Sequence, residues 1–125
     1  MVLLCIDDDP EDIELFVDAV KMISVDYTVV AAVNGREALK KLEGIVPDYI
    51  FLDINMPVMD GKETLVKIRN DQRLQSVPIF ILSTSNDAKE VDTCRKLGAT
   101  MWLVKPSSFW ELVGYLRLVF SQSWL

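Results

Sequence analysis

Histidine is absent from this 125-residue sequence, and cysteine occurs only twice. Without histidine the chain cannot run Ser-His or Cys-His catalysis, form a histidine zinc site or act as a histidine phosphocarrier. Cys5 lies in an apolar run and Cys94 falls on a helical core spacing, so we expect buried free thiols rather than a disulfide. Any chemistry must therefore use carboxylates, hydroxyls, lysine or a metal ion.

Long hydrophobic runs and basic segments are missing as well. The longest apolar run is residues 1–6, too short for a transmembrane helix or a signal-peptide core. We therefore expect a cytoplasmic protein that does not bind membranes. The 19 acidic residues against 13 basic ones give a formal charge of −6. Nucleic-acid binding needs a basic surface, and no Lys/Arg-rich segment is present, so we expect no nucleic-acid partner.

Short apolar stretches alternate with amphipathic ones along a chain of single-domain length. Nearly unbroken apolar runs are typical of strands buried on both faces of a parallel sheet. The expected strands cover residues 2–6, 27–33, 49–52, 79–82 and 101–104. Apolar residues at helical spacing predict helices around residues 13–23, 38–42, 65–69, 88–97 and 108–120. This (βα)5 order predicts one α/β domain over residues 1–125, with helices on both faces of a doubly wound, five-stranded parallel sheet.

Charged and hydroxyl residues follow four of the expected strands. Asp7 and Asp8 end the first strand, Asp53 the third, Ser83 the fourth and Lys105 the fifth. In a doubly wound sheet, functional groups gather at the carboxyl ends of the strands. Three adjacent carboxylates would raise one another's pKa, and Mg²⁺, which prefers oxygen ligands, relieves this repulsion. The charges of the carboxylates, Mg²⁺ and the lysine sum to zero, which favours a magnesium site.

Asp9 has a different expected role from its two neighbours. It precedes Pro10, and aspartate followed by proline is typical of an N-cap with proline at the first helical position. Glu11 and Asp12 are then favourable in the first turn, where the helix dipole stabilises negative charge. We therefore interpret Asp9 as a helix cap rather than a metal ligand.

Four segments resemble the signature segments of a response-regulator receiver domain, and they occur in the same order. They are VLLCIDDDPED, PDYIFLDINMPVMDGKETLVKIR, VPIFILSTSND and GATMWLVKPSSF. The resemblance covers nearly all of the chain and implies a flavodoxin-like strand order 2-1-3-4-5. It also implies two-component signalling: a stand-alone receiver without an effector domain, not an enzyme, that takes a phosphoryl group from a sensor histidine kinase or a histidine phosphotransfer protein.

Carried onto this sequence residue by residue, the resemblance implies that Asp53 is the phosphoacceptor. Mg²⁺ would bind the carboxylates of Asp8 and Asp53 and the backbone carbonyl of Asn55. Asp7 would help to position the metal, directly or through water. Lys105 would pair with Asp53 before transfer and with a phosphoryl oxygen afterwards.

The resemblance also assigns residues that transmit the signal. Ser83 takes the place of the family's switch hydroxyl, and Trp102 stands where the family usually has tyrosine or phenylalanine. Two interpretations of the indole stay open: it swings with the switch, or packing holds it in one position. Pro106 resembles the family's cis-proline, which would aim the preceding lysine into the site. Asn55 and Ser85 match positions that line the path of the attacking water.

Two other classes of protein share parts of this pattern. A haloacid-dehalogenase-type phosphatase or phosphotransferase also uses a strand-end aspartate and Mg²⁺, and residues 7–9 contain its D-x-D. However, Glu11 stands where that family has threonine or valine, and the chain has no room for its cap domain. A flavodoxin-like cofactor binder is disfavoured because the acidic first loop would repel the FMN phosphate.

The last expected helix carries two sets of apolar residues. One stripe should pack on the sheet and consists of Phe109, Leu112, Val113, Leu116 and Phe120. Trp110, Tyr115 and Leu118 fall outside this stripe, and Trp124 and Leu125 add apolar area. Two interpretations stay open: these are half-buried flank residues, or they form a partner or homodimer surface. That surface would lie on the side of the fourth helix, fifth strand and fifth helix.

Overall fold

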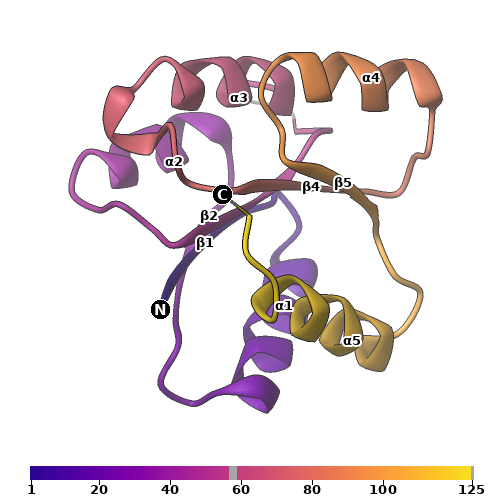
Figure 1. Cartoon of the computed structure of the whole chain (residues 1–125). Helices are drawn as coiled ribbons and strands as arrows, with labels where there is room; N and C mark the ends of the chain where they lie inside the picture. Colours follow the sequence, from indigo (N-terminus) through magenta and orange to yellow (C-terminus); the bar gives the residue numbers. More distant parts are fainter. Residues whose placement is uncertain (57–58, 125) are drawn as a thin grey trace.

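The computed structural model describes residues 1–56 and 59–124; Leu125, part of the predicted apolar terminus, lies outside them. Strands and helices alternate along the chain (Figure 1). The strands are β1 (Val2–Ile6), β2 (Thr28–Ala32), β3 (Tyr49–Asp53), β4 (Ile79–Ser83) and β5 (Met101–Val104). The helices are α1 (Pro10–Ile23), α2 (Gly35–Leu42), α3 (Gly61–Arg69), α4 (Ala88–Lys96) and α5 (Phe109–Phe120), with a short 3₁₀ helix, η1 (Gln72–Leu74), after α3.

The five strands form one parallel sheet in the order β2-β1-β3-β4-β5. This confirms the predicted α/β class and the 2-1-3-4-5 order. Strand β3 is the middle strand, between β1 and β4, whereas β2 and β5 form the edges. Because all the strands run the same way, their carboxyl ends meet at one rim of the sheet.

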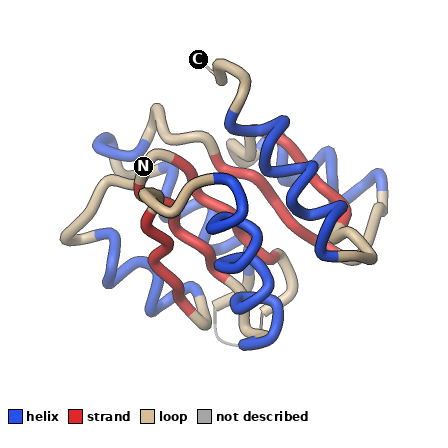
Figure 2. The backbone as a smooth tube through the Cα atoms, turned by 90° about the horizontal axis from the view of Figure 1, so that it is seen from below, coloured by secondary structure: helices blue, strands red, loops and turns tan. Residues whose placement is uncertain are grey.

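Helices cover both faces of the sheet and create two apolar cores. Helices α2, α3 and α4 lie on one face, and α1 and α5 lie on the other (Figure 1). Figure 2, seen from below Figure 1, shows helices lying in front of the strands. Alternate residues of each strand face the two cores: in β1, Leu4 and Ile6 belong to the first, and Leu3 and Cys5 belong to the second.

Most element boundaries agree with the sequence within one or two residues. Strand β2 is shorter than predicted, and β3 and β4 each continue one residue further, so that Asp53 and Ser83 are themselves the last strand residues. Helix η1 was not predicted, because a single turn carries no periodic apolar stripe. In α5 the predicted core residues Leu112 and Leu116 are buried, together with Val119, which the prediction omitted.

Two further expectations are confirmed at this level. Asp9 is the N-cap of α1: its carboxylate accepts a hydrogen bond from the Glu11 backbone N–H at 2.9 Å. Cys5 and Cys94 are free and buried, one in each core. Across residues 1–56 and 59–124, none of the helices is long and apolar enough to cross a membrane.

Candidate phosphoacceptor site

Four strands bring the predicted site residues to one rim of the sheet. Asp7 follows β1 directly, and Asp53 ends β3, the strand paired with β1. Ser83 ends β4, the next strand, and Lys105 follows β5. The Lys105 backbone N–H donates to the Ser83 carbonyl at 2.7 Å, which joins the ends of β4 and β5. The parallel register therefore places carboxylates, a hydroxyl and an ammonium side by side.

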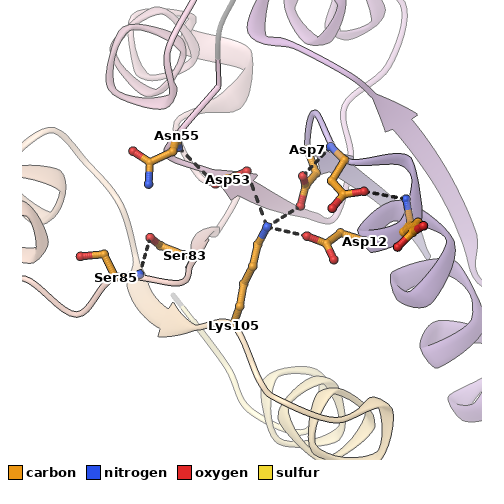
Figure 3. A network of polar contacts seen from close by, with 9 residues as sticks. Asp7, Asp12, Asp53, Asn55, Ser83, Ser85 and Lys105 are labelled. Atoms are coloured by element: carbon orange, nitrogen blue, oxygen red, sulfur yellow. Dashed lines mark hydrogen bonds and ion pairs between the residues drawn. The ribbon is translucent and has the colours of Figure 1, made fainter.

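Asp53 is 7% exposed and lies at the centre of this rim. One of its carboxylate oxygens accepts from the Asn55 backbone N–H at 3.1 Å, and the other lies 3.6 Å from the Lys105 ammonium (Figure 3). Burial raises the pKa of Asp53 to about 6, and the charges of Asp7 and Asp8 act in the same direction. The Asn55 N–H and Lys105 oppose the shift without cancelling it.

Lys105 is the cation of the site, but Asp53 is not its nearest partner. Its ammonium donates to Asp12 at 2.8 Å and to Asp7 at 3.0 Å (Figure 3). Burial alone would lower the pKa of Lys105, but the hydrogen bonds to these two carboxylates raise it above its ordinary value. Lys105 therefore stays protonated and is shared among three acidic groups.

Asp12 is the site residue that the sequence analysis missed. We predicted only that its negative charge would be favourable in the first turn of α1. In the structure its carboxylate accepts a hydrogen bond from Lys105, which lies 93 residues later in the sequence. A signal was present in the sequence: Asp12 precedes Phe16 by four residues, and Phe16 is 2% exposed. Residues four apart share a helix face, so Asp12 begins the inward face of α1, where a carboxylate needs a partner.

The acidic cluster fits a hard divalent cation. Asp7, Asp8 and Asp53 each offer a carboxylate oxygen, and these oxygens all lie within 4.8 Å of one another. Asp7 and Asp53 are buried and Asp8 is exposed, so the cluster opens to solvent on one side. Oxygen donors in this number suit Mg²⁺, which commonly binds one or two carboxylates and keeps several waters. The side chain of Asn55 is exposed beside this cluster.

The predicted switch residues are joined through the loop after β4. The buried Ser83 hydroxyl accepts from the Ser85 backbone N–H at 3.1 Å (Figure 3). The Trp102 indole N–H donates to the Ser85 carbonyl at 3.0 Å, and its ring packs against the α2/α3/α4 core. Ser83 and Trp102 thus both form hydrogen bonds with the backbone of Ser85. This is a conformation in which packing and a hydrogen bond hold the indole, and its movement on activation stays a prediction.

The cis peptide bond predicted before Pro106 has to be corrected. All peptide bonds among the described residues are trans, including the bond between Lys105 and Pro106. A trans bond is the default for proline by about 0.5–1 kcal/mol. With that bond trans, the Lys105 ammonium still reaches three carboxylates, so cis geometry is not required to aim it into the site.

The apolar residues of α5 divide into a core-facing stripe and a more exposed set, as predicted. However, Trp124 near the C-terminus does not add to the exposed set. Trp110 and Leu118 are 65% and 62% exposed, and Tyr115 is half-buried. Trp124, in contrast, packs edge-on against Phe80 at 5.0 Å between ring centroids, and its indole N–H donates to a backbone carbonyl of α5. Trp124 therefore belongs largely to the core rather than to an exposed surface.

Comparison with known proteins agrees with this geometry. A family model described as the response regulator receiver domain matches residues 3–117. The chain is 34% identical to protein PilG of Pseudomonas aeruginosa over 74% of this chain and 69% of PilG. It is 39% identical to the nitrate/nitrite response regulator protein NarL of Escherichia coli over 82% of this chain and 47% of NarL. The chain thus spans less than half the length of some curated relatives.

Solved structures show the same architecture. Chemotaxis protein CheY4 of Vibrio cholerae superposes with a TM-score of 0.85 at 32% identity, covering 94% of this chain and 97% of CheY4. The phosphorylated cyanobacterial phytochrome response regulator RcpA gives a TM-score of 0.86 at 27% identity, over 94% and 89% of the two chains. These matches lend no support to the haloacid-dehalogenase alternative. With the family match over residues 3–117 and the acceptor-like rim, the chain belongs to the response regulator receiver domain family.

Proposed function

We propose that Asp53 accepts a phosphoryl group from a phosphohistidine on a sensor histidine kinase or a histidine phosphotransfer protein. The observation that carries the proposal is the position of its carboxylate, buried at the end of β3 between an acidic cluster and the ammonium of Lys105. The similar regulator RcpA was solved in a phosphorylated form, which supports acceptance of a phosphoryl group by this fold.

In the proposed reaction, a carboxylate oxygen of Asp53 forms a bond to phosphorus while the bond from phosphorus to the imidazole nitrogen of the donor breaks. The imidazole leaves with the electron pair and later takes a proton from water. Asp8, Asp53 and the Asn55 carbonyl would hold Mg²⁺, with Asp7 assisting. When bound, the metal supplies positive charge for the phosphoryl oxygens. Lys105 supplies a further positive charge beside the acceptor.

The chain would then act as a signal receiver, phosphorylated itself, rather than as an enzyme with turnover. The Ser83 hydroxyl accepts from Ser85 but keeps its own proton to donate, so it can bind a new phosphoryl oxygen. A shift of the loop after Ser83 would also move the hydrogen-bond partner of Trp102, because its indole N–H donates to the Ser85 carbonyl in that loop. Buried free thiols suit the reducing cytoplasm, where we place this exchange.

A labelling experiment tests the acceptor. Incubation with phosphoramidate and Mg²⁺ should add one phosphoryl group, stable in acid and labile in base, detected by mass spectrometry. Asp53→Asn should abolish the label, and chelation of Mg²⁺ should suppress it. Asp60→Asn is the matched control, because Asp60 is an exposed N-cap of α3 outside the acidic cluster. Full labelling of the Asp53→Asn variant would refute the assignment.

We also propose that the exposed residues of α5 belong to an output surface on the α4, β5 and α5 side. Leu118 is 62% exposed, and Met101 on the edge strand β5 is 42% exposed. Beryllofluoride with Mg²⁺, which mimics a phosphoryl group, should change self-association or partner affinity. Leu118→Glu should blunt that change and leave Asp53 labelling intact. Val25→Glu, an equally drastic change at an exposed turn residue outside these three elements, should have no effect.

A further inference from the structure

The ammonium of Lys105 is held most closely by a carboxylate outside the metal-capable cluster. Its distances to carboxylate oxygens are 2.8 Å for Asp12, 3.0 Å for Asp7 and 3.6 Å for Asp53 (Figure 3). The cluster that could hold a cation consists of Asp7, Asp8 and Asp53 and does not include Asp12. Asp12 therefore has the shortest contact to the lysine and no part in the proposed metal site.

The three partners of Lys105 also differ in their exposure to solvent. The side chains of Asp7 and Asp53 are 8% exposed, whereas that of Asp12 is 36% exposed. Asp12 lies on the first turn of α1, so it approaches the lysine from the helix layer rather than from the sheet. The lysine thus bridges an inner pair of carboxylates and an outer one.

We propose that Asp12 is a positioning residue that holds Lys105 in the unphosphorylated site and competes with the phosphoryl group for it. The inference rests on the proposed acceptor role of Asp53. A phosphoryl group on Asp53 would bring new oxygens to the inner side of the lysine and draw the ammonium inward. The contact with Asp12 would then lengthen or break, and Asp12, already partly exposed, would return to water at small cost.

Asp12 therefore stabilises the unphosphorylated state more than the phosphorylated one. A group that binds one state of a two-state system preferentially shifts the population toward that state. A partly exposed ion pair has a modest effect on such an equilibrium, so removal of the Asp12 charge should change it by about two- to fivefold. The change should favour binding of a phosphoryl group or its mimic.

Titration of the full chain with beryllofluoride at saturating Mg²⁺, followed by tryptophan fluorescence, tests this inference. We expect Asp12→Asn to bind beryllofluoride about two- to fivefold more tightly than the unmodified chain. Asp12→Glu keeps the charge and should restore most of the original affinity. Glu11→Gln removes an exposed carboxylate from the same turn and should leave the affinity within the error of the titration.

A double-mutant cycle shows whether Asp12 acts through the lysine. In a Lys105→Ala background, the substitution Asp12→Asn should no longer tighten binding. An equal gain in both backgrounds would identify a general charge effect and overturn the inference, and so would an unchanged affinity in Asp12→Asn alone. If the unmodified chain bound no beryllofluoride, the proposed function itself would fail, and the inference would fail with it.

Discussion

At the scale of single residues, Asp53 shows how a functional group opposes the stability of the fold. Burial disfavours its charged form, and the carboxylates of Asp7 and Asp8 add to that effect. Its pKa of about 6 lies above the ~3.9 of an aspartate in an unfolded chain. The folded, metal-free protein therefore binds this proton more tightly than the unfolded chain does. Stability linked to that proton is present at low pH and is lost as the pH rises through about 6.

The substitution Asp53→Asn should therefore stabilise the metal-free protein at neutral pH. We expect a gain of about 1–3 kcal/mol in the free energy of unfolding at about pH 7, because the buried charge is removed. The gain should shrink toward zero below about pH 3, where the carboxyl of the unmodified chain is protonated in both states. Urea unfolding with a chelator, repeated at several pH values, measures the difference. A gain that does not depend on pH would contradict this account.

The substitution Ser83→Ala separates metal binding from switching. The Ser83 hydroxyl is fully buried and bonds the loop after β4, but it is not among the groups expected to bind Mg²⁺. Ser83→Ala should therefore keep the Mg²⁺ affinity of the unmodified chain within about twofold while losing most of the conformational response to beryllofluoride. Asp8→Ala is the contrasting variant and should lose the metal. Equal loss of Mg²⁺ binding in both variants would show that the roles are wrongly divided.

At the scale of elements, the start of α3 is held against the end of the acceptor strand β3 at Gly61. The Gly61 backbone N–H donates to the Ile54 carbonyl at 3.1 Å, next to Asp53. A Cβ at this position would lie 2.5 Å from the Ile54 Cα and 2.7 Å from the Asp53 carbonyl oxygen. Both are backbone atoms that cannot move without moving the acceptor. The close packing of this element therefore sets the geometry of the site.

The substitution Gly61→Ala should cost about 1–3 kcal/mol in the free energy of unfolding, because overpacking forces the backbone apart. It should also weaken Mg²⁺ binding, since the displaced atoms adjoin Asp53. Gly114→Ala is the matched control: a Cβ on this residue of α5 would meet no atom within 4 Å. That variant should gain about 0.5–1 kcal/mol from helix propensity and keep its affinity for the metal. Urea unfolding and Mg²⁺ titration of both variants would check the contrast.

At the scale of the whole molecule, one sheet separates two cores, and each core contains one cysteine. Cys5 is 4% exposed in the core beneath α1 and α5, and Cys94, a residue of α4, is fully buried in the other core. Burial raises the pKa of both thiols, which further reduces the fraction of reactive thiolate. Because the same strands form the floor of both cores, the two faces should unfold together.

The thiols report this cooperativity directly. In the variants Cys5→Ala and Cys94→Ala, the remaining thiol should resist a disulfide reagent in native buffer and react at the same urea concentration as global unfolding. Far-ultraviolet circular dichroism of the same samples gives the reference transition. Exposure of one thiol well before the other would show that the two faces unfold separately and would contradict a single cooperative unit.

The sequence predicted the strands and the site-bearing strand ends, because these depend on local periodicity and on parallel topology, whereas the sheet order was implied by the resemblance to the receiver family. Apolar runs with few polar interruptions identified the buried strands, and the residues after them followed by necessity. The predictions were weaker where no periodic signal exists. Helix η1 is a single turn. The packing of Trp124 into the core depends on its contact with Phe80, more than 40 residues earlier in the sequence.

The sequence by itself determined which chemical groups stand at the rim: Asp7, Asp8, Asp53, Ser83 and Lys105. Only the tertiary structure decided how they are partnered. It brought Asp12 to Lys105, 93 residues away, and joined Trp102 to the loop after β4. The reason is that periodicity places a residue on a face or at a strand end. The choice among several carboxylates within reach, in contrast, depends on differences in distance and burial that arise only when the helices pack on the sheet.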